Sequence, residues 1–127
     1  MLSNCNVTAM AAVKDLDEAK KFYGEALGLN QTDENPGGVT YTCGSGKLFV
    51  YPAPTAGTNQ GTSATWEVSG IEAVVSDLHS KGVTNFEHYE MPGATLEGDI
   101  HNWGGMKAAW FKDPSGNILG LSEIPKA

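Results

Sequence analysis

The stretch VKDLDEAKKFYGEALGL, residues 13–29, decides the fold. Asp15 can accept hydrogen bonds from the free N–H groups at a helix start, and the acidic residues Asp17 and Glu18 follow where the helix dipole favours negative charge. Gly28 suits the left-handed turn that ends many helices. Between these signals, apolar side chains recur at helical spacing: Leu16, Ala19, Phe22, Tyr23, Ala26 and Leu27. A short apolar run at 7–13 precedes them, so we predict a strand followed by a helix.

The rest of the chain repeats this pattern. Segments 39–43 and 47–51, separated by Gly44-Ser45-Gly46, predict a hairpin, and the Pro- and Gly-rich segment 52–62 predicts a linker. A second strand candidate at 63–68 then precedes an amphipathic helix that ends at Gly82. The apolar positions of that helix are Ile71, Val74, Val75 and Leu78. Further strands are predicted at 83–87, 107–112 and 118–123, with a long irregular and potentially functional loop at 89–105.

The two halves align at a constant offset, which pairs Thr8 with Ser63 and Leu16 with Ile71. We therefore predict an α+β fold built from two βαβββ modules. Module one covers about residues 5–51, the linker 52–62 and module two about 63–125. Together they form a single domain over 1–127.

Composition narrows the range of partners. Lys and Arg number 8 against 15 Asp and Glu, which gives a net charge of −7. This charge repels phosphate backbones, so no nucleic acid is expected, and no apolar run is long enough for a membrane span. The N-terminus lacks the features of a signal peptide, and Cys5 and Cys43 are read as reduced thiols of a cytoplasmic protein. A disulfide between these two cysteines stays open as an alternative.

Two motifs carry a family resemblance that covers nearly the whole chain. Residues 13–29 resemble the first strand–helix signature of the vicinal oxygen chelate superfamily, which includes glyoxalases, bleomycin resistance proteins and extradiol dioxygenases. Trp103-Gly104 and the FKDPSGN stretch at 111–117 resemble its C-terminal signature, in which Asp-Pro-Ser-Gly-Asn has turn chemistry. The resemblance implies that the modules pair into a curved mixed sheet with an inner cleft and outer helices.

The same resemblance locates the positions of a metal site. Metal-dependent members hold a divalent ion with four side chains in the cleft, usually His, Gln or Glu. The corresponding positions here are Thr8, Phe49, Ser63 and Gly120. None of them offers imidazole or carboxylate, the donors that divalent metals require. We therefore expect neither a metal nor another cofactor, and the chain is most like the drug-binding members without a metal.

Strand alternation, with its phase taken from these positions, predicts which side chains face the cleft. Trp66 is assigned to the core, because alternation turns it toward the helix. Trp110 is assigned to the cleft, because Gly120 opposite leaves room for it. The predicted ligand-binding residues are Met10, Phe49, Tyr51, Ser63, Thr65, His101, Trp103, Met106 and Trp110.

Aromatic faces and thioethers bind flat, conjugated molecules, and an acidic protein suits a cationic one. Together with the resemblance to drug-binding members, which usually act as homodimers, these features imply a non-catalytic homodimer that sequesters an aromatic or apolar antibiotic or metabolite, conferring resistance. The alternative is a lyase or isomerase of secondary metabolism, metal-independent or with an atypical metal site. In that case His101, Glu67 or Tyr89 would be the acid–base candidates. No catalytic residue is assigned under the first interpretation.

Overall fold

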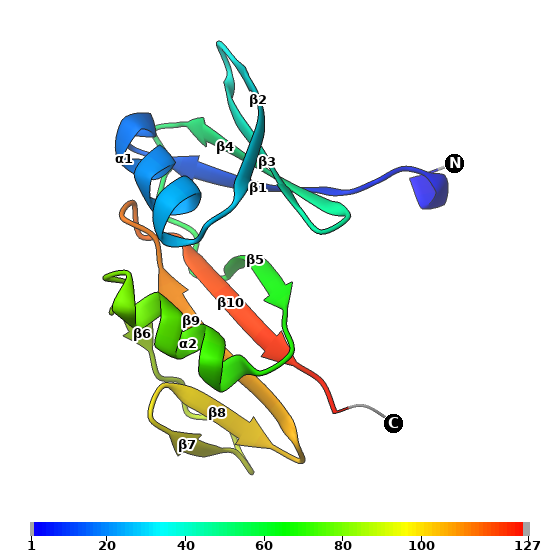
Figure 1. The fold of residues 1–127 in the computed structure, drawn as a ribbon, viewed down its shortest axis with the longest axis vertical. Coiled ribbons are helices and arrows are strands. Elements are labelled where there is room, and N and C mark those ends of the chain that lie inside the picture. The colour runs from blue at the N-terminus through cyan, green and yellow to red at the C-terminus, as the bar shows by residue number, and fades with distance from the viewer. Residues whose placement is uncertain (1, 126–127) are drawn as a thin grey trace.

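A computed structural model describes residues 2–125 of the chain. Within these residues the strands form two mixed sheets, one on each side of the segment 53–61. Helix α1 lies against the first sheet and helix α2 against the second, on the same side of the molecule (Figure 1). The predicted α+β class with two repeated modules and outer helices is therefore confirmed.

The first sheet has the strand order β1-β4-β3-β2, with β1 parallel to β4 and the other pairs antiparallel. Its elements are η1 (Leu2–Asn4), β1 (Thr8–Val13), α1 (Leu16–Lys20), the π-helical segment η2 (Lys21–Ala26), β2 (Asn30–Asn35), β3 (Gly38–Cys43) and β4 (Gly46–Pro52). The predicted hairpin is the pair β3 and β4. Strand β2 was not predicted, because its six residues are polar and exposed and show no apolar alternation.

The second sheet has the order β5-β10-β9-β8-β7, and β6 also pairs with β9. Its elements are β5 (Thr62–Glu67), α2 (Ile71–Ser80), β6 (Phe86–Glu87), β7 (Thr95–Glu97), β8 (Ile100–Trp103), β9 (Met106–Lys112) and β10 (Ile118–Glu123). The prediction of an irregular loop at 89–105 was wrong in part. Residues 95–103 form the β7–β8 hairpin, whereas 89–94 and the turn at 104–105 lie outside the strands.

Both helices begin and end for identifiable reasons. The Asp15 carboxylate accepts hydrogen bonds from the N–H groups of Asp17 and Glu18, at 3.0 and 3.2 Å, and so caps α1. Helix α2 has Gly70 at its N-cap and is capped from the other end of the chain, where Glu123 accepts from the Ile71 N–H at 2.7 Å. No helix within residues 2–125 is long and apolar enough to cross a membrane.

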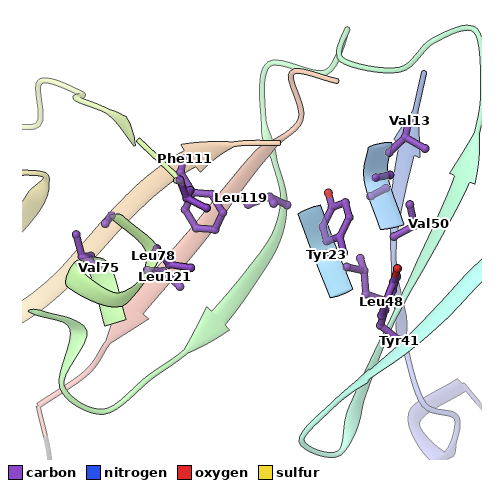
Figure 2. Close-up of a cluster of buried hydrophobic side chains, with 14 of the residues drawn as sticks. Val13, Tyr23, Tyr41, Leu48, Val50, Val75, Leu78, Phe111, Leu119 and Leu121 are labelled. Carbon is purple, nitrogen blue, oxygen red and sulfur yellow. The ribbon is translucent and has the colours of Figure 1, made fainter. Parts of the chain in front are cut away.

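The core lies between the helices and the sheets. Figure 2 shows it as two groups of side chains that face each other across the module boundary. The first group is Val13, Tyr23, Tyr41, Leu48 and Val50, and the second is Val75, Leu78, Phe111, Leu119 and Leu121. Phe22 connects the groups, since its ring centroid lies 5.2 Å from that of Tyr23 and 6.4 Å from that of Phe111.

A buried polar junction joins the modules at the turn 113–117. The Tyr23 hydroxyl donates to Asp113 Oδ2 at 2.6 Å, and the Asn117 amide donates to the same oxygen and to the Ala12 carbonyl. Asp113 Oδ1 accepts from the N–H groups of Ser115 and Asn117. The Asp-Pro-Ser-Gly-Asn motif is thus a turn, and it also ties the end of β1 and the first helix to the second module.

Candidate functional site

The sheet faces that point away from the helices are the candidate site. In β4, Leu48 and Val50 are buried toward the helix, so alternation turns Phe49 and Tyr51 to the opposite face. Their rings stack with centroids 5.9 Å apart and planes 15° apart. Met10 on β1 lies beside Phe49 in the parallel register, and 49% of its surface is exposed. The first module therefore presents an apolar and partly aromatic face.

The centre of the second module's face is Trp110 on β9. It lies directly across from Gly120 on β10, and Gly120 is paired on its other side with Thr65 on β5. A Cβ atom on Gly120 would lie 3.4 Å from the Trp110 indole and 3.0 Å from the Thr65 hydroxyl. The absence of a side chain at Gly120 therefore makes the space in which Trp110 and Thr65 lie side by side.

Two further rings complete an aromatic cluster around Trp110. The Tyr89 ring lies 5.1 Å from the Trp110 ring and the His101 ring 5.0 Å, both edge to face. Tyr89 is 39% exposed, whereas His101 is almost fully buried. Burial first, and the charge of Glu87 second, raise the pKa of the Tyr89 hydroxyl against an opposing effect of Lys112. Tyr89 therefore presents a neutral phenol beside the indole.

His101 is a support of this cluster rather than one of its exposed groups. Its Nε2 accepts a hydrogen bond from the Tyr89 N–H at 2.9 Å, and its Nδ1 lies 3.4 Å from the Ala108 carbonyl. Because Nε2 accepts from an amide, the ring proton belongs on Nδ1, and the imidazole is neutral in this arrangement. Both nitrogens are occupied inside the protein, so His101 holds Tyr89 in place.

The remaining predicted residues lie toward the ends of the same face. Trp103 and Met106 pair across the tight turn between β8 and β9, and Met106 is 38% exposed. Ser63 lies at an irregularity in the β5–β10 pairing. Strands β1 and β5 are neighbours, which brings the faces of the two modules next to each other. Binding by these nine residues stays a prediction.

Two hollows adjoin the face. One of about 670 Å³ lies at the module boundary, where its lining includes Lys47, Thr65 and Trp66. Another of about 840 Å³ lies beside Tyr89 and His101 and is otherwise lined by residues between His88 and Leu96. Sequence analysis did not place Tyr89 among the ligand-binding residues. It named Tyr89 only as an acid–base candidate of the enzymatic alternative, because the position of Tyr89 beside Trp110 depends on the β7–β8 hairpin and on His101.

The donor set does not fit the divalent ion of metal-dependent relatives. Thr8, Phe49, Ser63 and Gly120 supply two hydroxyls, a phenyl ring and no side chain, and none is a strong metal ligand. Within residues 2–125, no group of three or more His, Cys, Asp or Glu side chains is arranged to hold a metal ion. We therefore derive no chemistry through a metal at this face.

Comparisons with known proteins agree with the fold. The model of the Glyoxalase/Bleomycin resistance protein/Dioxygenase superfamily matches residues 7–121. TnmS3, an antibiotic binding protein from Streptomyces sp. CB03234, has a TM-score of 0.73 and 21% identity, covering 98% of this chain and 99% of its own. A glyoxalase/bleomycin resistance protein from the same organism has a TM-score of 0.66 and 23% identity, with coverages of 91% and 97%.

Enzymes are also among the similar structures. Lactoylglutathione lyase from Agrobacterium tumefaciens has a TM-score of 0.70 and 18% identity, covering 94% of this chain and 93% of its own. A search of curated protein sequences gave no significant match. Because the family model spans most of the chain, this protein belongs to the Glyoxalase/Bleomycin resistance protein/Dioxygenase superfamily.

Proposed function

We propose that this protein sequesters a flat aromatic or apolar antibiotic or metabolite without converting it, and thereby confers resistance in the cytoplasm. The observation that carries the proposal is the Trp110 cluster. The Trp110 indole lies beside Gly120 and is flanked by the Tyr89 phenol and the Thr65 hydroxyl. This arrangement offers a ligand both stacking area and hydrogen-bonding groups on an open face. The antibiotic binding by TnmS3, a protein of the same fold, supports this choice of ligand class.

A second copy of the chain would complete the site. Met10 is 49% exposed and Met106 38%, so apolar side chains on this face still contact solvent in the single chain. Exposed apolar surface of this kind is typical of interfaces and ligand sites. A homodimer in which each partner covers the other's face would bury these residues and turn the open face into a cleft. The net charge of −7 would favour a cationic ligand in such a cleft.

The enzymatic alternative receives less support from the geometry. A lactoylglutathione lyase shares the fold, so the fold alone does not choose between binding and catalysis. His101, the strongest acid–base candidate in the sequence, has both ring nitrogens hydrogen-bonded inside the protein. A proton-transfer role would require one of these bonds to break first.

The first test is a tryptophan fluorescence titration against a panel of aromatic antibiotics and the planar cation ethidium, with and without EDTA. We expect saturable quenching that EDTA does not change, with the ligand recovered intact. Protection of cells should rise in proportion to the amount of protein, as for a stoichiometric binder. A converted product, or protection at substoichiometric amounts, would instead identify an enzyme.

The residue-level test compares two tryptophans. Trp110→Ala should weaken binding of a quenching ligand at least about tenfold in isothermal titration calorimetry, because a large aromatic side chain at a binding surface is often a hot spot. Trp66→Phe is the comparison variant, since Trp66 packs against the core and lines the boundary hollow but is not among the rings around Trp110, so a loss of affinity in this variant alone would place the ligand in that hollow. Equal ligand affinities of the two variants would show that Trp110 does not contact the ligand.

A further inference from the structure

The three histidines of the chain gather around one segment, although they come from different elements. His79 is in the last turn of α2, His88 directly follows β6, and His101 is in β8. The segment is 88–94, the stretch without regular structure that carries Tyr89 to the face of Trp110. The sequence shows no spacing that relates these histidines, so only the fold reveals their proximity.

Asp99 bridges two of them from the turn between β7 and β8. Its Oδ2 lies 2.8 Å from His79 Nε2 and its Oδ1 lies 2.7 Å from His88 Nε2, so each imidazole donates to one carboxylate oxygen. Although partial burial acts to raise it, hydrogen bonds from His88 and His79 hold the pKa of the Asp99 carboxyl below its usual value. Asp99 is therefore ionised throughout the neutral and mildly acidic range.

The bridge anchors the start of segment 88–94. His88 is tied to Asp99, and the next residue, Tyr89, donates its N–H to His101. His79 is also held in place by stacking on Phe86, with ring centroids 4.9 Å apart. The C-terminus of α2, the end of β6 and the β7–β8 turn are thus joined through one carboxylate, next to the hollow that Tyr89 lines.

We propose that the His79–Asp99–His88 bridge is a pH-responsive clamp that positions Tyr89 against Trp110. Asp99 is a positioning residue in this view, because it acts through His88 and does not itself lie among the aromatic rings. This proposal depends on the proposed function at one point only: the face around Trp110, which the clamp shapes, is the ligand site.

The direction of the pH response follows from the charges of the groups in the clamp. Protonation of His79 or His88 converts a neutral hydrogen bond to Asp99 into a charge-assisted ion pair. The clamp should therefore tighten as the pH falls from 8 to 6, the interval in which imidazole side chains generally change charge. Protonation of His101 would act in the opposite direction, since its Nε2 would no longer accept from the Tyr89 N–H. Because the Asp99→Asn variant keeps His101, its comparison with the wild type separates the two effects.

Other charged groups on the packed elements have their own partners or remain acidic. On α2, Asp77 pairs with Lys81 at 3.2 Å, and Glu87 on β6 pairs with Lys112 on β9 at 3.2 Å. Glu90 within the segment and Glu97 at the end of β7 are the other carboxylates nearby. Imidazole is the side-chain group that generally changes charge near neutral pH, so the clamp is tested between pH 6 and pH 8.

Hydrogen–deuterium exchange of the full chain at pH 6 and pH 8, corrected for intrinsic rates and run with EDTA, tests the clamp. We expect segment 88–94 to be about three- to five-fold more protected at pH 6, the range typical of partly exposed ion pairs. Asp99→Asn, which a turn tolerates well, should abolish this difference, and His88→Gln should reduce it. Asp77→Asn is the matched control, because it removes a nearby carboxylate that contacts neither histidine, and it should retain the difference.

The clamp is overturned if wild-type protection is the same at both pH values, or if Asp99→Asn keeps the wild-type response. Calorimetric titration with ethidium at both pH values then separates this inference from the proposed function. A pH-dependent segment without ethidium binding would support the clamp and count against a cation-binding face. Ethidium binding to a protein whose segment does not respond to pH would support the binding function and refute the clamp.

Discussion

The Tyr23 hydroxyl links the helix of the first module to the turn of the second. Burial first, and then the charge of Asp113 and the hydrogen bond to it, raise the pKa of Tyr23, so the hydroxyl keeps its proton and remains a donor. Tyr23→Phe would leave the buried Asp113 carboxylate one donor short. We expect the free energy of unfolding to fall by about 1.5–3 kcal/mol, the range for hydrogen bonds to charged groups, as measured by urea denaturation at pH 7.

Tyr41→Phe provides the control for that variant. Tyr41 is equally buried, and its ring centroid lies 6.1 Å from that of Tyr23, yet its hydroxyl has no hydrogen-bond partner among residues 2–125. Loss of this hydroxyl should change the unfolding free energy by less than about 1 kcal/mol. If both variants lose the same amount, the stabilisation comes from the ring environment and not from the bond to Asp113.

Gly120 shows how far a single residue can be interpreted before a structure is known. Its place opposite Trp110 follows from counting along two strands, and the structure has this pairing. The contribution of Thr65 to the same space depends on the β5–β10 register, which shifts between Ile118 and Leu119. Counting residues in one strand does not reveal a bulge, so strand alternation places neighbours within a strand better than neighbours across it.

Helix α2 depends on a residue far from it in the sequence. Glu123 on β10 accepts from the Ile71 N–H, where Gly70 provides no side-chain cap. Glu123→Ala should expose this N–H and lower the unfolding free energy by about 1 kcal/mol, with faster amide exchange in the first turn of α2. Glu123→Gln keeps an acceptor oxygen and should retain most of the stability. An identical loss in both variants would mean that the charge of Glu123, rather than its hydrogen bond, supports the helix.

Elements that bury an apolar face were predictable, and elements that do not were missed. The helix at 71–80 and the hairpin of β3 and β4 have periodic apolar residues, because each packs one face on the core. Strand β2 and strand β7 have only exposed side chains, so their pairing rests on backbone hydrogen bonds that leave no pattern in the sequence. The first helix also winds as a π-helix over Lys21–Ala26, which apolar spacing alone does not distinguish from an α-helix.

Contacts between modules were the hardest part of the molecule to predict. The turn chemistry of 113–117 is local and was recognised, but its bonds to Tyr23 and to the Ala12 carbonyl join residues that are 90 and 105 positions apart in the sequence and have no local signature. The same holds for the histidines that meet at Asp99. The sequence motifs therefore indicated the family and the turn at 113–117, whereas the hydrogen bonds that support the site became visible only in the folded structure.

The assembly state provides the last prediction. If a second copy covers the open face, Met10 is buried in the dimer, and a charge there would have to be desolvated on association. Met10→Lys should weaken dimerisation at least about tenfold in sedimentation equilibrium and weaken ligand binding with it, because the cleft needs both chains. Ala73→Lys adds the same charge to an exposed position of α2 on the helix side and should change neither property. A wild-type protein that stays monomeric while it binds ligand tightly would show that one chain forms the whole site.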